Sequence, residues 1–235
     1  MLKFLPSCGS GGTGRRAGLK NLYPQGCESS TLSSRRTFMD RWISKVDRRI
    51  LAYIVGVALG DGNLSNPNGR AVRLRVTCDT RYPLLILKIQ KAIQAILPLN
   101  KVGLVRRSEH CVDISSYSRC WEKWLGWKSG KGSKFQQNVS VPKWIMAEKR
   151  FRIPCLKGLI ETDGSLYVDR GYKMVNFVTT IPKLAKDVMI MVAALGFQAN
   201  LYQFSGPHKM KYTVRISKNV SAFISVLNLE KVKTV

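Results

Sequence analysis

Two apolar segments of the chain each end in an aspartate followed by a glycine. They are Ile54–Gly62 and Leu156–Gly164, and their acids are Asp61 and Asp163. If the two segments are neighbouring helices, the carboxylates at their ends repel each other, and a divalent cation bound between them relieves the repulsion. Oxygen ligands without paired His or Cys suit Mg²⁺, although another divalent cation is not excluded. Such an ion could polarise a phosphodiester and activate water, so the pattern predicts a metal-dependent hydrolytic site.

Small residues recur four positions apart in both segments. Gly56 and Gly60 share one helix face in the first, and Gly158 and Thr162 share one in the second. Two helices with such faces can cross with their backbones almost in contact. The simpler alternative is that both segments form only a packing seam. Glu161, two residues before Asp163, should point away from it and act as a surface group or as support behind the metal ligands.

The elements around the two segments repeat. Asp163 follows Asp61 by 102 positions, and the same offset pairs residues 76–77 with 178–179 and residues 112–115 with 214–217. Each copy reads as helix, two strands, helix, two strands and a final helix, with Asp47 as the N-cap of the first helix and Pro154 in the first turn of the second motif helix. Residues 72–77 alternate between apolar and basic or polar side chains, which predicts a half-buried strand. The chain is therefore predicted to contain two copies of one αββαββα unit.

Composition points to a polyanionic partner. The 235 residues carry a formal net charge of +25 and a pI near 10.2, which favours a nucleic acid over an anionic membrane because the basic residues are spread through periodic segments. Six cysteines without a Cys-x-x-Cys pair disfavour zinc fingers, and they fit a reducing compartment. We expect no membrane association and a cytoplasmic or organellar protein that is not secreted.

The two motifs and the repeat resemble the LAGLIDADG homing endonucleases, in the single-chain form that carries two motifs. The resemblance covers about residues 47–235. It implies an α+β fold of two pseudo-twofold-related half-domains that form a saddle-shaped antiparallel sheet surface. It also implies a monomeric, intron-encoded enzyme that makes a staggered double-strand break in a long DNA target with Mg²⁺, using Asp61 and Asp163 as catalytic metal ligands.

Further site residues follow from the resemblance and from strand alternation. A lysine commonly helps to order the attacking water in this family, and Lys134, or Lys131, is the candidate here, with Lys231 or Lys233 in the second half. Family members commonly place a polar residue and then a lysine after the second strand, where this chain has Cys78-Asp79 and Thr180-Ile181. The residues predicted to contact DNA are Asn63, Arg73, Arg75, Thr77, Arg106, Ser108, Asp113, Ser165, Tyr167, Gln203, Lys211, Thr213 and Arg215. The stretch Val175, Phe177 and Thr179 is predicted to form a less polar recognition face in the second half.

Four segments are predicted. Residues 1–38 read as a disordered basic arm, 39–127 as the first half-domain, 128–149 as a linker and 150–235 as the second half-domain. Double-stranded DNA is the expected partner. The alternative function is an RNA-binding maturase that uses the same scaffold on intron RNA, with weak or no cleavage.

Overall fold

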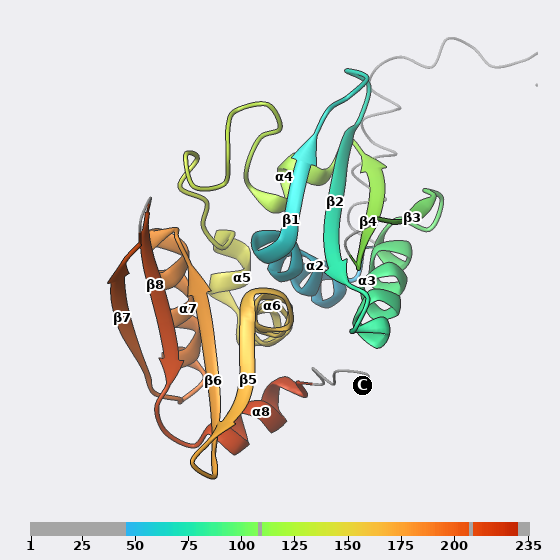
Figure 1. The fold of residues 1–235 in the computed structure, drawn as a ribbon. Coiled ribbons are helices and arrows are strands. Elements are labelled where there is room, and N and C mark those ends of the chain that lie inside the picture. Colours follow the sequence, from blue (N-terminus) through green and yellow to red (C-terminus); the bar gives the residue numbers. More distant parts are fainter. Residues whose placement is uncertain (1–45, 108–109, 207–208, 230–235) are drawn as a thin grey trace, which may run out of the picture. The chain divides into compact units, whose positions relative to one another are not determined.

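Helices and strands follow one another in the same order twice (Figure 1). The computed structural model describes residues 46–107, 110–206 and 209–229, so the predicted arm at 1–38 and the candidates Ser108, Lys231 and Lys233 lie outside the described residues. The first half contains α2 (Arg48–Asp61), β1 (Gly62–Ser65), β2 (Val72–Asp79), α3 (Pro83–Ile96), β3 (Val102–Arg106), β4 (Cys111–Ser118) and α4 (Trp121–Leu125). The second half contains α6 (Lys149–Asp163), β5 (Gly164–Asp169), β6 (Tyr172–Thr179), α7 (Pro182–Ala194), β7 (Ala199–Ser205), β8 (Met210–Ile216) and α8 (Val220–Leu227).

The first motif helix, α2, begins at the predicted cap. The Asp47 carboxylate accepts hydrogen bonds from the backbone N–H groups of Arg49 at 2.8 Å and Ile50 at 3.3 Å. These bonds satisfy two of the donors that the first turn of a helix leaves unpaired. From Leu51 to Gly60 every residue of α2 is buried, as its apolar residues on more than one side predict.

The second motif helix, α6, begins earlier than the sequence predicts. Pro154 is the sixth residue of α6 rather than part of its first turn. The added first turn holds Phe151, which is 3% exposed and packs edge-on against Trp144 of α5 (Lys143–Ala147) with ring centroids 5.2 Å apart. We attribute the longer helix to this tertiary packing, because local propensity favours a start near Pro154. The short helix α5 lies inside the predicted linker.

Each half builds one four-stranded antiparallel sheet. The strand orders are β1-β2-β4-β3 and β5-β6-β8-β7, so the second sheet repeats the topology of the first. Residues of β2 alternate strictly between buried and half-buried, with Val72, Leu74 and Val76 on the buried face. The α+β fold and the repeated αββαββα order are therefore confirmed.

The strand register departs from the single offset of 102. Gly62 pairs with Val76 in the first sheet, and Gly164 pairs with Phe177 in the second, so β6 follows β2 by 101 positions. The hairpin from β5 to β6 is one residue shorter because a tight turn at Arg170-Gly171, with φ of 48° and 84°, joins its strands. A shift of one residue moves every side chain of a strand to the opposite face. Val175, Phe177 and Thr179 are consequently buried, and the prediction that they form a recognition face is wrong.

No helix of the described residues is long and apolar enough to cross a membrane.

Candidate metal and nucleic-acid site

The two motif helices meet through their small residues. A Cβ atom added to Gly56 would overlap the backbone carbonyl of Cys155, and one added to Gly158 would overlap the carbonyl of Tyr53. At Gly60 an added Cβ would lie 2.9 Å from the Cβ of Thr162, which is also too close. The helices α2 and α6 are therefore in direct backbone contact, as the four-residue spacing predicts.

This contact brings the ends of the two helices, and their acids, to one place. An added Cβ on Gly60, the residue before Asp61, would lie 3.4 Å from Oδ2 of Asp163. Asp61 is exposed and Asp163 is half-buried. The glycine after each acid donates its N–H to the carbonyl four residues back, Ala58 in α2 and Ile160 in α6. After each acid the backbone passes directly into the first strand of its sheet. Both acids therefore lie at the junction between the two motif helices and the two sheets.

Lys134 lies at the same junction, although it follows Asp61 by 73 positions in the sequence. Its Nζ donates hydrogen bonds to the carbonyls of Ala58 at 3.3 Å and Leu59 at 2.7 Å, and also to that of Gly60. These carbonyls belong to the last turn of α2, where the helix dipole is negative, and the Ala58 carbonyl also accepts the N–H of Gly62. Burial lowers the pKa of Lys134, and the negative charges of Asp163 and Asp61 partly oppose that shift. The predicted lysine therefore lies within electrostatic reach of both acids.

A cavity of about 400 Å³ opens beside this junction. Its lining includes Gly60, Lys134 and Asp163 from the motif region, and Lys209 and Lys211 from the second half. Basic side chains around a carboxylate can bind a phosphate group, since they and a cation held by the carboxylate both attract the negative charge of the phosphate. Lys211, predicted to contact phosphate, is thus placed on the wall of the cavity that Asp163 also lines.

The donor set fits a hard divalent cation. Both acids supply oxygen, and among residues 46–107, 110–206 and 209–229 no group of three or more His, Cys, Asp or Glu side chains could hold a metal ion by itself. A cation at Asp61 and Asp163 would need further oxygen ligands from backbone, water or phosphate. Mg²⁺ is commonly bound in this way, by one or two carboxylates with water and substrate phosphate completing the shell.

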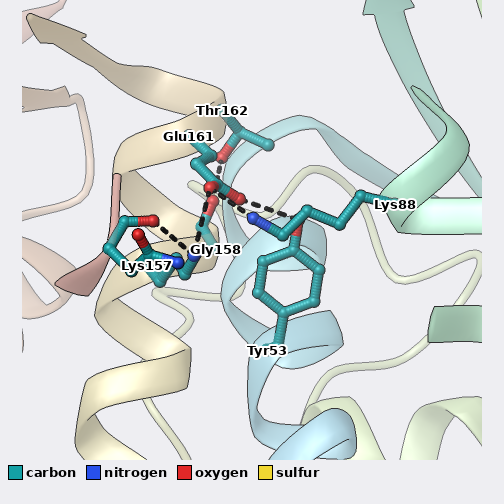
Figure 2. A network of polar contacts seen from close by, with 7 residues as sticks. Tyr53, Lys88, Lys157, Gly158, Glu161 and Thr162 are labelled. Atoms are coloured by element: carbon teal, nitrogen blue, oxygen red, sulfur yellow. Dashed lines mark hydrogen bonds and ion pairs between the residues drawn. The ribbon is translucent and has the colours of Figure 1, made fainter. Parts of the chain in front are cut away.

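Glu161 is buried, contrary to the expectation of a surface group. It is 2% exposed, and its carboxylate accepts hydrogen bonds from the Tyr53 hydroxyl at 2.8 Å and from Lys88 Nζ at 2.6 Å. Figure 2 shows these side chains converging on Glu161 from α2 and α3, with Lys157 on the same helix as Glu161. Glu161 does avoid the junction, as expected, but it does so by joining α6 to the two first-half helices through a buried ion pair.

The open face of the first sheet, which we define as the side that carries Arg73 and Arg75, holds most of the DNA contacts predicted in the first half. Cross-strand partners share a face in an antiparallel sheet. Asn63 is opposite Arg75, and Ser65 is opposite Arg73, whose Nε donates to the Ser65 hydroxyl at 3.1 Å. Thr77 lies on the same face, so this part of the prediction agrees with the structure.

Asp113 lies on this open face but is only 5% exposed. It accepts a hydrogen bond from Thr77 Oγ1 at 2.7 Å and pairs with Arg107 Nη2 at 2.6 Å, while Arg75 Nη1 lies 4.0 Å away. A carboxylate so enclosed cannot reach a base edge. Its predicted DNA contact is therefore corrected to a role in holding the two arginines.

Two predicted contacts lie on the wrong face. Arg106 pairs with Val112, which is buried, so its side chain is on the helix side of the sheet, and Arg107 takes the open-face position instead. Gln203 pairs with Tyr212, one residue out of step with Thr213, and so also lies away from the open face. The physical reason is the same for both, since side chains alternate at every residue and each prediction was one residue out of register.

The open face of the second sheet is the side of Thr213 and Arg215. Ser165 is opposite Asn176, which in turn is opposite Arg215, and Tyr167 lies on the same face. The Tyr167 hydroxyl is 3.0 Å from Asn176 Nδ2 and 3.3 Å from Arg215 Nη2, so these three side chains form one polar cluster. Residues on this face that the sequence interpretation missed are Asn176, Val178, Asn200, Tyr202 and Phe204. The Arg170-Gly171 turn signal is the sequence feature that could have revealed them.

Comparison with known proteins gives a consistent result. Residues 151–226 match a family model described as a LAGLIDADG-like domain. Variants of the homing endonuclease I-DmoI superpose with a TM-score of 0.58 at 18% identity, covering 79% of this chain and 98% of theirs. I-DmoI in complex with DNA and Mn gives 0.57 at 17% identity, covering 80% and 99%.

A structure with lower sequence identity has a similar fold. Full-length DUF199/WhiA from Thermatoga maritima gives a TM-score of 0.56 at 9% identity, covering 78% of this chain and 56% of that one. A search of curated proteins finds no match. Together these matches confirm the predicted resemblance and its two-sheet fold.

Proposed function

Because the chain carries a LAGLIDADG-like domain and has the fold of I-DmoI, we propose that it is a site-specific endonuclease that cuts both strands of a long DNA target. The observation that supports this proposal is the junction of Asp61, Asp163 and Lys134 at the ends of two helices in backbone contact. The fold by itself does not assign cleavage, since DUF199/WhiA shares it. The acids are what a hydrolytic enzyme requires.

In this proposal Asp61 and Asp163 hold a divalent cation, with Mg²⁺ the first candidate. When bound, the cation supplies charge stabilisation for the phosphodiester and a more acidic water. Lys134 places its positive charge beside that water and both acids, held there by its hydrogen bonds to the end of α2. Because one acid comes from each half, the pseudo-twofold arrangement presents one acid to each DNA strand.

The open faces of the two sheets hold the duplex. Arg73 and Arg75 in the first half, and Lys211 and Arg215 in the second, provide the positive charge along these faces. A net charge of +25 makes the affinity for a DNA backbone strong and salt-dependent. The remaining parts of the proposal are that the protein is a monomer, is intron-encoded and acts in a cytoplasmic or organellar compartment.

The test is cleavage of a plasmid that carries the joined DNA sequences flanking the reading frame's intron. The full chain should linearise this plasmid with Mg²⁺ and leave it intact with EDTA. Asp61→Asn and Asp163→Asn should each abolish linearisation or leave only nicking, a loss larger than the roughly 10–100-fold that removal of a group behind a metal ligand costs. Lys134→Met should lower the cleavage rate while DNA binding is retained.

Asp47→Asn is the matched control, since Asp47 caps the opposite end of α2 from the junction and asparagine caps a helix as well as aspartate does. It should cut like the unaltered protein. An intact plasmid under all metal conditions would refute the proposal. If the same preparation bound and spliced intron RNA, including after loss of both acids, the maturase alternative would replace it.

A further inference from the structure

Three apolar side chains lie exposed on the open face of the second sheet, and we call them the apolar patch. They are Val178 on β6, and Tyr202 and Phe204 on β7, with exposures of 38%, 41% and 56%. Val178 is opposite Thr213, which is opposite Tyr202, and Phe204 is opposite Lys211. The patch therefore shares its face with the basic residues that would hold DNA.

Two of the three equivalent positions in the first sheet are polar, and the third is Val105, which lies opposite Asp113 as Tyr202 lies opposite Thr213. Val178 corresponds to Thr77, because β6 follows β2 by 101 positions. Thr213 corresponds to Asp113, because Thr213 lies opposite Val178 and Asp113 lies opposite Thr77. Phe204 corresponds to Arg107, which is paired with Asp113. At the positions of Val178 and Phe204 the first half thus presents hydrogen-bonding and charged groups where the second presents exposed hydrocarbon, whereas Val105, 57% exposed, is the single apolar counterpart of Tyr202.

The patch borders a cavity with polar walls. A hollow of about 340 Å³ is lined by Tyr202, Phe204, Asn176, Thr213 and Arg215. The two rings lie 6.5 Å apart with planes inclined by 28°, so they form one continuous apolar wall. Lys211 and Arg215 lie on the same face and favour the approach of a phosphate backbone. If Lys211 and Arg215 bind the phosphate backbone of a duplex, the base edges in its major groove face the rings of Tyr202 and Phe204.

Only one base-pair edge in the major groove is apolar. Thymine carries a 5-methyl group there, whereas guanine, cytosine and adenine present only hydrogen-bonding atoms. Exposed valine and phenylalanine side chains and the ring of Tyr202 form no hydrogen bonds with hydrogen-bonding edges and leave those edges unpaired. On the DNA target of the proposed endonuclease, on which this inference rests, we propose that the apolar patch reads thymine methyl groups in the half-site bound by the second half.

The test replaces thymine by deoxyuridine, which removes the methyl group and no hydrogen-bonding atom. A bound duplex is taken from the flanking sequences or selected from a randomised pool. Competition binding by the full chain is then measured in EDTA at fixed salt, so that cleavage does not intervene. Each methyl that the patch covers should be worth about fourfold in affinity, the effect of one buried methylene-sized group. Substitution in the first half-site, where Val105 is the one exposed apolar counterpart of the patch, should have a smaller total effect than in the second.

Variants locate the effect on the patch. Val178→Thr copies the residue at the equivalent first-half position and keeps the side-chain volume, so it should fold and should reduce discrimination at one thymine. Phe204→Ala should remove the preference for thymine over deoxyuridine at the thymine that Phe204 covers. Leu104→Ala is the control, because Leu104 is 45% exposed but pairs with Ile114 on the opposite face of the first sheet. It should leave the thymine preference unchanged.

The outcomes separate this inference from the function on which it rests. Specific binding with no deoxyuridine effect, or an equal effect in both half-sites, overturns the inference alone. Specific binding with an effect that survives Val178→Thr and Phe204→Ala also overturns it. Failure to bind any duplex specifically overturns both the inference and the proposed function.

Discussion

Gly158 lies in the close contact between the two motif helices, and its replacement by alanine measures how much that contact contributes to stability. A Cβ at this position would overlap the carbonyl oxygen of Tyr53 and would lie 2.7 Å from the backbone N of Val57 and 3.1 Å from the backbone C of Gly56. All three neighbours are backbone atoms of α2. No change of rotamer can relieve the overlap, so α2 and α6 must separate.

The cost follows from the contacts that separation weakens. A gap of 0.5–1 Å forfeits about a quarter to a half of the attraction between facing atoms, and a buried leucine makes some 40–60 contacts of about 0.1–0.2 kcal/mol each. Weakening the contacts of Val57 and Leu159, which are both fully buried, costs about 4 kcal/mol on this basis. Alanine returns about 1 kcal/mol because it favours helix more than glycine does. We expect a net loss of about 3 kcal/mol, at the upper end for over-packed cores.

The sign of the change is the decisive quantity. In an exposed helix Gly→Ala stabilises a protein by up to about 1 kcal/mol, whereas Gly158→Ala should lower the thermal midpoint by roughly 6–12 °C for a domain of this size. Urea and thermal unfolding of the full chain, followed by circular dichroism, measure both quantities. Gly103→Ala is the control, because its Cβ would meet only Ser115 Oγ at 3.4 Å and should change stability by less than about 1 kcal/mol. If Gly158→Ala leaves stability unchanged or raises it, the close helix contact is refuted.

Three further outcomes are expected. Lys88→Met should destabilise the fold by about 2 kcal/mol in urea unfolding because it leaves the buried Glu161 carboxylate with only the longer 3.9 Å ion pair to Lys157. Glu161→Gln should restore part of the loss in the double variant, and a fully additive double variant would contradict this. Asp113→Asn should raise non-specific DNA affinity and steepen its salt dependence, since it frees two arginines and removes a negative charge; an unchanged salt slope would show that Asp113 does not restrain them. Burial raises the pKa of the Cys78 thiol to about 12, so the thiol stays protonated at pH 8. Cys78 should therefore resist iodoacetamide until the pH approaches 12 or the chain unfolds, whereas the half-buried Cys111 should react first. Mass spectrometry of the labelled peptides measures the reaction of both cysteines.

Local features of the sequence determined much of this protein. The apolar run of α2 and its cap at Asp47 specify a helix start, and the small residues four apart specify which faces of α2 and α6 can meet. The alternation through β2 specifies which side chains leave the core. Asp61 and Asp163 were predictable as a pair because each follows its helix directly, so helix contact fixes the position of the acid.

Register between strands was decided only in the tertiary structure. One residue fewer in the β5–β6 hairpin moves Val178 to the open face and Phe177 into the core, and one residue separates Arg107 from Arg106 in the same way. Pairing in a sheet is set by partners far along the chain and by turn geometry, so a constant sequence offset cannot report it.

Lys134 and Glu161 show the same division between sequence and structure. Their types suggested a charged role, but only the packed fold places the Lys134 ammonium on the carbonyls that end α2 and buries Glu161 against Tyr53 and Lys88. Both contacts join residues more than 70 positions apart. Periodicity within one helix or strand cannot encode such contacts, because they arise when separate elements pack and each buried charge must find a partner.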